Sequence, residues 1–127
     1  MRDSTVMPPI DLNIRAVISG IGQSRVARRL SDSGLSLTVD AAMEAIAAAG
    51  LKPTDIDGIA TWPGREVMDP FMSPVGVGEL KNALGLKLNW YEGGGESSSQ
   101  LGSVVNAVAA ISMGLARHVI CFRTVKE

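Results

Sequence analysis

Three glycines and three serines, within residues 93–99, form the stretch of this sequence best suited to chemistry. Glycine lets a ligand approach the backbone closely, and the free N–H groups at the start of a following helix stabilise an anion or a developing oxyanion. From the residues alone, a second interpretation is equally open: a serine caps the helix after a flexible turn. The candidates are Gly93, Gly94, Gly95, Ser97 and Ser98.

The single cysteine and the single histidine of the chain are weaker candidates. Cys121 lies inside the apolar run 119–122, where burial raises the pKa of a thiol, so we predict that it is not a nucleophile. His118 has no obvious acidic or hydroxyl partner nearby in the sequence and is interpreted as a surface residue. One cysteine excludes an internal disulfide, and with one histidine we expect no metal site.

Two patterns near the N-terminus have a functional and a structural interpretation. Gly20 and Gly22 resemble the start of a dinucleotide-binding motif, but its third glycine is replaced by Arg25, and a simple strand-end turn is favoured. Arg25, Arg28 and Arg29 have the charge to hold a phosphate of coenzyme A or a carboxylate. A solvated loop is the favoured interpretation of this cluster.

The proline-rich segment 63–75 is predicted to be a loop. Its apolar side chains can line a substrate channel, because methionine adapts to irregular ligands. Packing of the loop on its own domain explains them equally well. The side chains concerned are those of Met68, Phe71 and Met72.

The composition is that of an ordinary globular domain. The chain has 127 residues, of which 46% are hydrophobic and 20% charged, which is enough for one buried core. The formal net charge of −1 and the few aromatic residues argue against a nucleic-acid partner. The longest apolar stretch is shorter than the roughly 20 residues that span a bilayer. The N-terminus lacks a secretory pattern, so we expect a cytoplasmic protein.

Apolar periodicity predicts an α/β fold in which strands alternate with helices. A loosely held arm over residues 1–13 precedes a domain over 14–127. A helix over 37–49, capped by Ser36 or Thr38 and stopped by Gly50, joins the first two strands into a parallel β-α-β unit. The third strand is less hydrophobic and is predicted to lie at an edge of the sheet. Strands are expected at 16–21, 56–62, 87–91 and 119–122, and further helices at 77–84 and 98–115.

The helix predicted over 98–115 is apolar on nearly every side. Such a helix is normally buried all round. A single sheet with two long helices does not supply enough covering elements. We therefore expect the chain to be part of something larger or half of a tight oligomer.

Three segments together resemble the N-terminal half of the thiolase superfamily. They are VISGIG, DAAMEAIAAAGLKPTDIDGIATW and SSSQLGSVVNAVAAISMGLARHVICFR, and the likeness covers residues 15–124. The branch that they resemble most is that of the lipid-transfer-protein (sterol-carrier-protein-x-type) thiolases and the related steroid side-chain aldolases. The segment YEGGG before a small-residue helix is typical of that branch.

The resemblance implies a thiolase-like fold that repeats a β-α-β-α-β-α-β-β unit twice in layers. This chain would supply most of the first unit, with the helix near Ser98 as the buried central helix; the second half is absent. The resemblance also implies a homodimer that pairs through the edge strand. The residues of that strand are Leu88, Asn89, Trp90 and Tyr91.

True thiolases carry a nucleophilic cysteine at the start of the central helix. Counting back from Gly114 places that position at Ser97, whereas the glycine run places it at Gly95. Claisen chemistry through a thioester needs a thiolate, and no residue from 89 to 100 is cysteine. The departure agrees better with relatives that cleave a β-hydroxyacyl-CoA by retro-aldol chemistry.

The resemblance thus implies the N-terminal part of an enzyme acting on acyl-CoA thioesters, by carbon–carbon bond cleavage or acyl transfer, in steroid side-chain degradation and lipid metabolism. Gly93, Gly94, Gly95 and Ser98 would form the oxyanion pocket. Coenzyme A would enter as part of the substrate, with no separate cofactor. Related aldolases work with a second, OB-fold-bearing chain, which makes such a partner an expectation here. The alternative is a non-catalytic scaffold or subunit that binds lipid or acyl-CoA.

Overall fold

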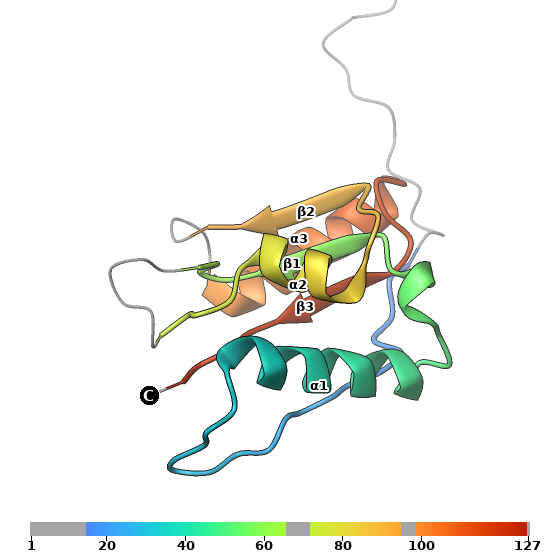
Figure 1. The fold of residues 1–127 in the computed structure, drawn as a ribbon. Helices are drawn as coiled ribbons and strands as arrows, with labels where there is room; N and C mark the ends of the chain where they lie inside the picture. The colour runs from blue at the N-terminus through green and yellow to red at the C-terminus, as the bar shows by residue number, and fades with distance from the viewer. Residues whose placement is uncertain (1–14, 66–71, 95–98, 127) are drawn as a thin grey trace, which may run out of the picture.

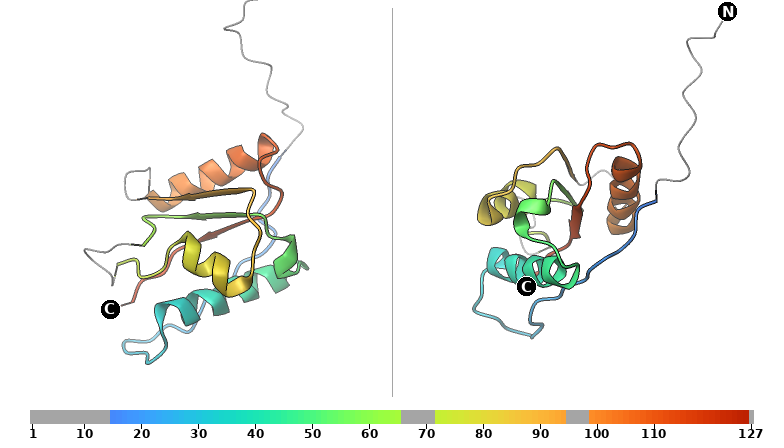
Figure 2. Two further views of the ribbon diagram at one scale, coloured as in Figure 1. Left: turned by 45° about the horizontal axis from the view of Figure 1, so that its top comes forward. Right: turned by 90° about the vertical axis from the view of Figure 1, so that its right-hand side faces the viewer.

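The computed structural model describes residues 15–65, 72–94 and 99–126. In these segments a three-stranded sheet lies between helices, with α1 (Gly34–Ala48) and α2 (Val77–Leu84) on one face and α3 (Ser99–Ser112) on the other (Figures 1 and 2). The predicted α/β class is therefore confirmed. The arm predicted over 1–13 lies outside the described residues.

All three strands run parallel, in the order β2 (Trp90–Gly93), β1 (Gly58–Thr61) and β3 (Val119–Phe122). Gly58 is in register with Trp90 on one side and with Val119 on the other. Because the strands are parallel and in register, all their carboxyl ends meet at one edge of the sheet. Among the described residues β2 lies at an edge of the sheet, as predicted, although the strand begins at Trp90, so Leu88 and Asn89 precede it.

The core lies between the sheet and the α1 and α2 face. Ile59 of β1 and Leu80 of α2 are fully buried, and Ile46 of α1 packs against them. Ile120 of β3 completes the sheet's contribution to this cluster. Since side chains alternate along a strand, the neighbouring residues Ala60 and Cys121 face α3.

The helix α1 begins three residues before the predicted start. Ser33 caps it, with its Oγ accepting a hydrogen bond from the backbone N of Ser36 at 3.0 Å. The predicted caps are wrong because Thr38 lies one turn inside the helix, where its hydroxyl donates to the carbonyl of Gly34 at 2.8 Å. That hydroxyl also contacts the hydroxyl of Thr124, which ties α1 to the residues after β3.

The two shorter elements match their predictions closely. Helix α2 covers residues 77–84 as predicted, closed by Gly85, and β3 covers 119–122. Between α1 and β1, a short 3-10 turn, η1 (Pro53–Asp55), is closed by a hydrogen bond of 2.8 Å from the Lys52 backbone to Asp55.

The first predicted strand is wrong. Residues 16–21 belong to no strand of the sheet but run beside α1, as the segment from residue 15 in Figure 1 shows. A Cβ at Gly20 would stand 2.3 Å from the carbonyl oxygen of Ala45, and one at Gly22 would stand 2.1 Å from that of Ala41. The two glycines thus bring this backbone against the helix, where it has no strand neighbour.

The described residues bury only one side of α3, and the burial on every side expected within something larger or a tight oligomer stays a prediction. Ser103, Ala107 and Ala110 are buried against the sheet, but Leu101 is 78% exposed and Val105 65%. One face of the helix therefore packs and the other carries apolar side chains in the open. No helix within the described residues is long and apolar enough to cross a membrane.

Candidate functional site at the carboxyl edge of the sheet

A hollow of about 630 Å³ lies where β1 and β2 end. The parallel sheet brings the residues after Thr61 and Gly93 together there, beside the amino end of α2. Carboxyl edges of parallel sheets are the usual place for ligands in α/β proteins. The lining comes from residues 63–65, 76–79 and 93–94, with Asn82 and Tyr91.

Two of the four residues predicted for the oxyanion pocket line this hollow. Gly93 ends β2, and Gly94 follows it, so both contribute backbone to the wall. Gly95, Ser97 and Ser98 lie outside the described residues, and their proposed roles remain predictions. Ser99 is the first residue of α3 and has a φ of 71°, so the chain turns sharply as it enters the helix.

The backbones of the two segments that follow β1 and β2 lie close together in the hollow. Gly64 has a φ of 86°, in the left-handed region that favours glycine. A Cβ at this residue would stand 3.3 Å from the backbone N of Gly94 and 3.4 Å from the carbonyl carbon of Gly93. The bare backbone at residue 64 therefore sets how closely the segment after β1 approaches the glycine run.

A carboxylate and a guanidinium form the charged part of the hollow. Glu79 Oε2 accepts from the backbone N of Gly76 at 2.9 Å, and its Oε1 accepts from Arg65 Nη1 at 3.0 Å. Burial, the largest effect, opposes ionisation, but these hydrogen bonds and the amide of Glu79 itself outweigh it and lower the carboxyl's pKa. Glu79 therefore stays ionised as a cap of α2 and is a poor proton donor or general base.

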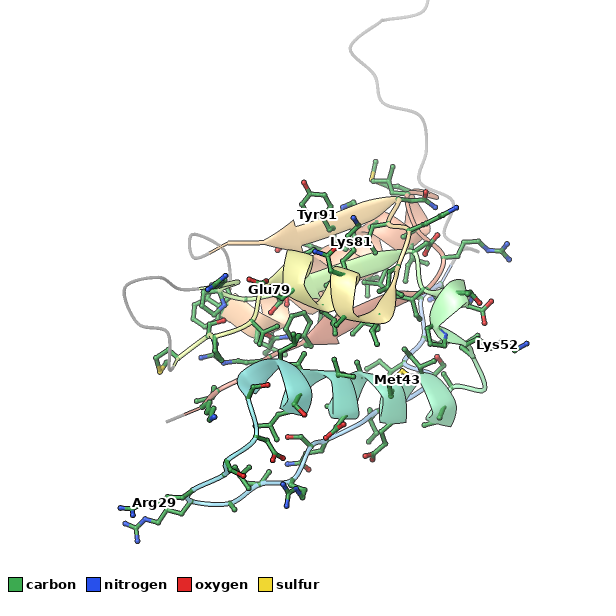
Figure 3. All side chains as sticks on the ribbon, viewed as in Figure 1. Arg29, Met43, Lys52, Glu79, Lys81 and Tyr91 are labelled. Carbon is green, nitrogen blue, oxygen red and sulfur yellow. The ribbon has the colours of Figure 1, made fainter. Side chains whose placement is uncertain are left out.

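Figure 3 shows how the side chains around α2 lie. Tyr91 stands on β2 above the helix, and its side chain is 67% exposed. Glu79 and Lys81 are on α2, at the start and near the end of the helix. Among the described lining residues of the hollow, Tyr91 is the one with a hydroxyl group.

The chain's one cysteine is not suited to nucleophilic chemistry, as the sequence predicted. Glu92 and Cys121 flank Ala60 in one row of the sheet. Burial, followed by the charge of Glu92, raises the pKa of Cys121 to about 11. A thiolate is therefore scarce at neutral pH.

We expect Cys121 to react slowly with iodoacetamide in the folded chain. About one thiol in a thousand is ionised at pH 8, and the alkylation rate should rise about tenfold per pH unit up to about pH 11. Mass spectrometry of the alkylated chain over time measures this rate, and the urea-unfolded chain is the control. A folded rate at pH 8 equal to the unfolded one would contradict the assignment.

The arginine cluster lies away from this hollow. Arg25 forms an ion pair of 2.5 Å with Asp32, which raises the pKa of the guanidinium through the hydrogen bond and then through the charge. Arg29 projects from the loop before α1, far from α2 in Figure 3. The structure thus gives the cluster no shared site with the glycine run, and phosphate binding by it stays a prediction.

The remaining candidates of the sequence are divided between described and undescribed residues. Met68 and Phe71 lie outside the described residues, whereas Met72 is 43% exposed. His118 is partly buried at the opposite edge of the sheet, where its backbone N donates to Asp57 at 3.0 Å. Gly20 and Gly22 precede no helix that begins near residue 25, as the sequence predicted, so they form no dinucleotide motif.

Sequence reasoning missed the most connected polar side chain. Asp57 accepts from the backbone N of Arg117 at 2.9 Å, from that of His118, and from the Asn89 side chain at 3.1 Å. Burial is the largest effect on its pKa and raises it, but these hydrogen bonds together lower it. The only signal in the sequence was an acidic residue directly before a buried strand, which many turns share.

Within the described residues no group of three histidine, cysteine or acidic side chains can hold a metal ion. Leu88, Asn89, Trp90 and Tyr91 lie at or just before the edge strand β2, whose outer side has no described strand neighbour. Dimer formation through them stays a prediction.

No family model matches the chain. It is 34% identical over 115 residues to a steroid side-chain-cleaving aldolase of Thermomonospora curvata, covering 88% of this chain and 27% of that protein. It is 32% identical over 117 residues to a 17-hydroxy-3-oxo-4-pregnene-20-carboxyl-CoA lyase of Mycobacterium tuberculosis, covering 91% and 28%. The chain thus spans about a quarter of the length of these curated relatives.

The comparison with solved structures also finds an aldolase. The chain superposes on the Ltp2-ChsH2(DUF35) aldolase with a TM-score of 0.75 and 30% identity, over 89% of this chain and 28% of that one. All three relatives are named as aldolases or lyases. None of the three names mentions a thiolase.

Proposed function

We propose that this chain is the N-terminal part of a steroid side-chain aldolase with a thiolase-like fold. It acts on β-hydroxyacyl-CoA thioesters and cleaves a carbon–carbon bond by retro-aldol chemistry. The observation that carries the proposal is the state of the cysteine: the chain's one thiol is partly buried in β3 with a raised pKa, while the relatives are aldolases and lyases. Retro-aldol cleavage needs no protein thiolate.

The name of the Mycobacterium relative contains a compound on which the atoms and electrons of a retro-aldol step can be followed. A hydroxyl at carbon 17 is β to the thioester carbonyl, so removal of its proton lets the bond between carbons 17 and 20 break. Carbon 17 becomes a ketone, and the electron pair passes to an enolate of the thioester. Protonation at carbon 20 then gives a three-carbon acyl-CoA, with no oxidant, reductant or free coenzyme A consumed.

The enolate is the charge that the carboxyl edge of the sheet would stabilise. Backbone N–H groups of Gly93, Gly94 and Gly95, with Ser98, which directly precedes α3 in the sequence, would supply donors where the oxygen becomes negative. Ser97 occupies the position of the thiolase nucleophile without acting as one. The proton-transfer groups come from the remainder of a protein of the relatives' length, since Glu79 is tied to Arg65 and Gly76.

The assembly would follow that of the structural neighbour, whose name joins Ltp2 with a DUF35 chain. We infer a DUF35-type, OB-fold-bearing partner, and a homodimer that pairs through β2. The homodimer contact is supported by the exposed Tyr91 and by the outer side of β2, which pairs with no strand in the described part of the chain.

The test feeds 17-hydroxy-3-oxo-4-pregnene-20-carboxyl-CoA to the protein that carries this sequence, co-purified with a DUF35 chain. We expect the 17-ketone and the three-carbon acyl-CoA in equal amounts by mass spectrometry, without added coenzyme A. The same substrate lacking the 17-hydroxyl is the control and should not be cleaved. The 127-residue chain alone should show no turnover.

Three outcomes would each overturn the proposal. A requirement for free coenzyme A indicates thiolytic cleavage, and release of coenzyme A as the only product indicates thioester hydrolysis. Turnover by the 127-residue chain alone would show that the catalytic groups lie within it.

A non-catalytic subunit that binds lipid or acyl-CoA is the second candidate. The engagement of Glu79 favours it, because that carboxylate is the one acidic side chain that the described lining of the hollow provides. Tight binding of the substrate by the assembled protein, with neither ketone nor short acyl-CoA formed, is the result that selects this candidate.

A further inference from the structure

The side-chain oxygen of Gln100 is a buried hydrogen-bond acceptor that lacks a donor. Gln100 is the second residue of α3, and its Oε1 atom is shielded from solvent. Within the described residues no donor reaches this atom, and no other buried side-chain nitrogen or oxygen is left unpaired. Native proteins pair nearly all such atoms, because an unpaired one has lost its hydrogen bonds to water without replacement. The oxygen therefore requires a donor that the described residues do not supply.

Gln100 belongs to the packed face of α3. Gln100, Ser103, Ala107 and Ala110 recur at intervals of three or four residues, which is the spacing of one helix face. Ser103, Ala107 and Ala110 are buried, and the Ser103 hydroxyl donates to the backbone carbonyl of Gln100 at 2.8 Å. The hydroxyl that follows Gln100 on this face is thus engaged with the backbone and does not serve the side-chain oxygen.

The amino end of α3 lies at the carboxyl edge of the sheet. The helix follows β2 and the residues after Gly93, and the chain enters it through Ser99, whose φ is 71°. Because long side chains on a helix lean toward its amino end, the Gln100 side chain extends toward this entry. A ligand oxygen held by the backbone after β2 would bring its neighbouring atoms toward the same end of α3.

A β-hydroxyacyl-CoA thioester carries two hydrogen-bond donors close to its carbonyl group. One is the β-hydroxyl, and the other is the N–H of the pantetheine amide nearest the sulfur. Retro-aldol cleavage removes the hydroxyl proton, and a neutral amide oxygen cannot take that proton up, so a bond to Gln100 would hold the hydroxyl in its unreactive form. The pantetheine N–H keeps its proton throughout the reaction. A fixed amide acceptor therefore suits the pantetheine arm and not the hydroxyl.

We propose that Oε1 of Gln100 accepts a hydrogen bond from the pantetheine amide N–H nearest the sulfur of the bound thioester. The inference rests on the proposed function, because it takes an acyl-CoA as the ligand and the backbone after β2 as the place of its carbonyl oxygen. The bond is the same before and during the reaction, so it contributes to substrate binding and not to the rate of the bound complex. Gln100 is then a binding residue for the arm of coenzyme A and takes no part in proton transfer.

Two ligands that differ in one donor test the proposal on the full-length protein that carries this sequence, co-purified with a DUF35 chain. The first is an N-acetylcysteamine thioester of the steroid acid without its 17-hydroxyl, which cannot undergo retro-aldol cleavage. The second has an ester oxygen in place of the amide N–H. We expect the parent protein to bind the first about tenfold more tightly by titration calorimetry, because the ester leaves the buried oxygen unpaired. Gln100→Met, which keeps the side-chain length without the acceptor, should bind both equally.

Two further variants and a kinetic measurement separate binding from a structural role. Gln23→Met, the same change at an exposed residue outside α3, is the matched control and should keep the tenfold preference. Gln100→Glu retains an acceptor oxygen and should still prefer the amide ligand. With the complete coenzyme A substrate, Gln100→Met should raise KM about tenfold and leave kcat within about twofold.

Three results overturn the inference and leave the proposed function standing. The first is a preference for the amide ligand that survives in Gln100→Met. The second is a lower unfolding temperature of Gln100→Met in the ligand-free assembly, which shows that the polypeptide itself supplies the donor. The third is a loss of discrimination by Gln100→Met between substrates with and without the hydroxyl, which makes the hydroxyl the donor. If the parent protein binds neither thioester nor the complete substrate, the inference and the proposed function fail together.

Discussion

Asp57→Asn is expected to destabilise the fold by about 2 kcal/mol at pH 7. The carboxylate of Asp57 joins the starts of all three strands, since it bonds the backbone N of Arg117 and of His118 before β3 and the side chain of Asn89 before β2. Hydrogen bonds to an ionised group contribute about 1.5–3 kcal/mol each, but water can replace part of this loss at a partly exposed site. The neutral amide of asparagine accepts hydrogen bonds more weakly than a carboxylate, and its own N–H groups would face the N–H donors that Asp57 binds.

The difference in the free energy of unfolding between Asp57→Asn and the parent chain should depend on pH. The folded pKa of Asp57 is lowered, so its contribution is complete above the unfolded pKa of about 3.9 and is lost as the pH falls through the folded value. Urea unfolding at several pH values between about 7 and 2.5 measures it. Asp40→Asn, at an exposed position of α1, is the control and should change little. A difference that persists unchanged at the lowest pH would contradict the role of the charge.

The helices and the last strand were predictable because their signals are local. Apolar spacing predicted both ends of α2 correctly. Gly50 and Gly85 follow the ends of helices as expected, and each has a positive φ. The predicted start of α1 was late because Ser33, Ser36 and Thr38 are all plausible caps in the sequence. Only the folded geometry selects Ser33, whose hydroxyl oxygen accepts from the N–H three residues later.

The first strand and the burial of α3 were not predictable from this chain alone. Residues 16–21 have the composition of a strand, but a strand also needs a neighbour, and Gly20 and Gly22 place this backbone on α1 instead. Likewise, the apolar outer face of α3 indicates burial, whereas Leu101 and Val105 are exposed here. In both cases composition indicates what a segment needs to contact and says nothing of which polypeptide supplies that contact.

Two glycines that line the hollow were candidates from the sequence, and their role in a functional site stays a prediction; the charged pair beside them was not anticipated. A glycine run after a strand placed the backbone wall at Gly93 and Gly94, and the parallel sheet brings it beside Gly64. Arg65 and Glu79 are fourteen residues apart, and nothing in their spacing indicates the ion pair of 3.0 Å that they form. Long-range pairs of this kind depend on how a loop folds back, which residue types do not determine.

Gly64→Ala and Gly78→Ala, the same change at two lining positions of the hollow, are expected to act in opposite directions. At Gly64 the φ of 86° is unfavourable for alanine, and the new Cβ would press on the backbone of Gly93 and Gly94. We expect a loss of about 1–2 kcal/mol in the free energy of unfolding. At Gly78, in α2, a Cβ meets no atom within 4 Å, and alanine favours the helix by about 0.5 kcal/mol or more.

Urea unfolding of the two single variants measures these changes on the 127-residue chain. If the proposed function holds, Gly64→Ala in the assembled protein should also lower turnover of the steroid acyl-CoA by about tenfold, because a shift of the glycine run would displace the proposed oxyanion donors, whose effect depends on a fraction of an ångström. Gly78→Ala should keep turnover within about twofold, since its methyl group displaces no backbone. If Gly64→Ala is as stable and as active as the parent, residue 64 does not hold the glycine run in place. Equal losses in both variants would instead show that the hollow tolerates no added methyl group, and the left-handed turn at Gly64 would then have no special part in the site.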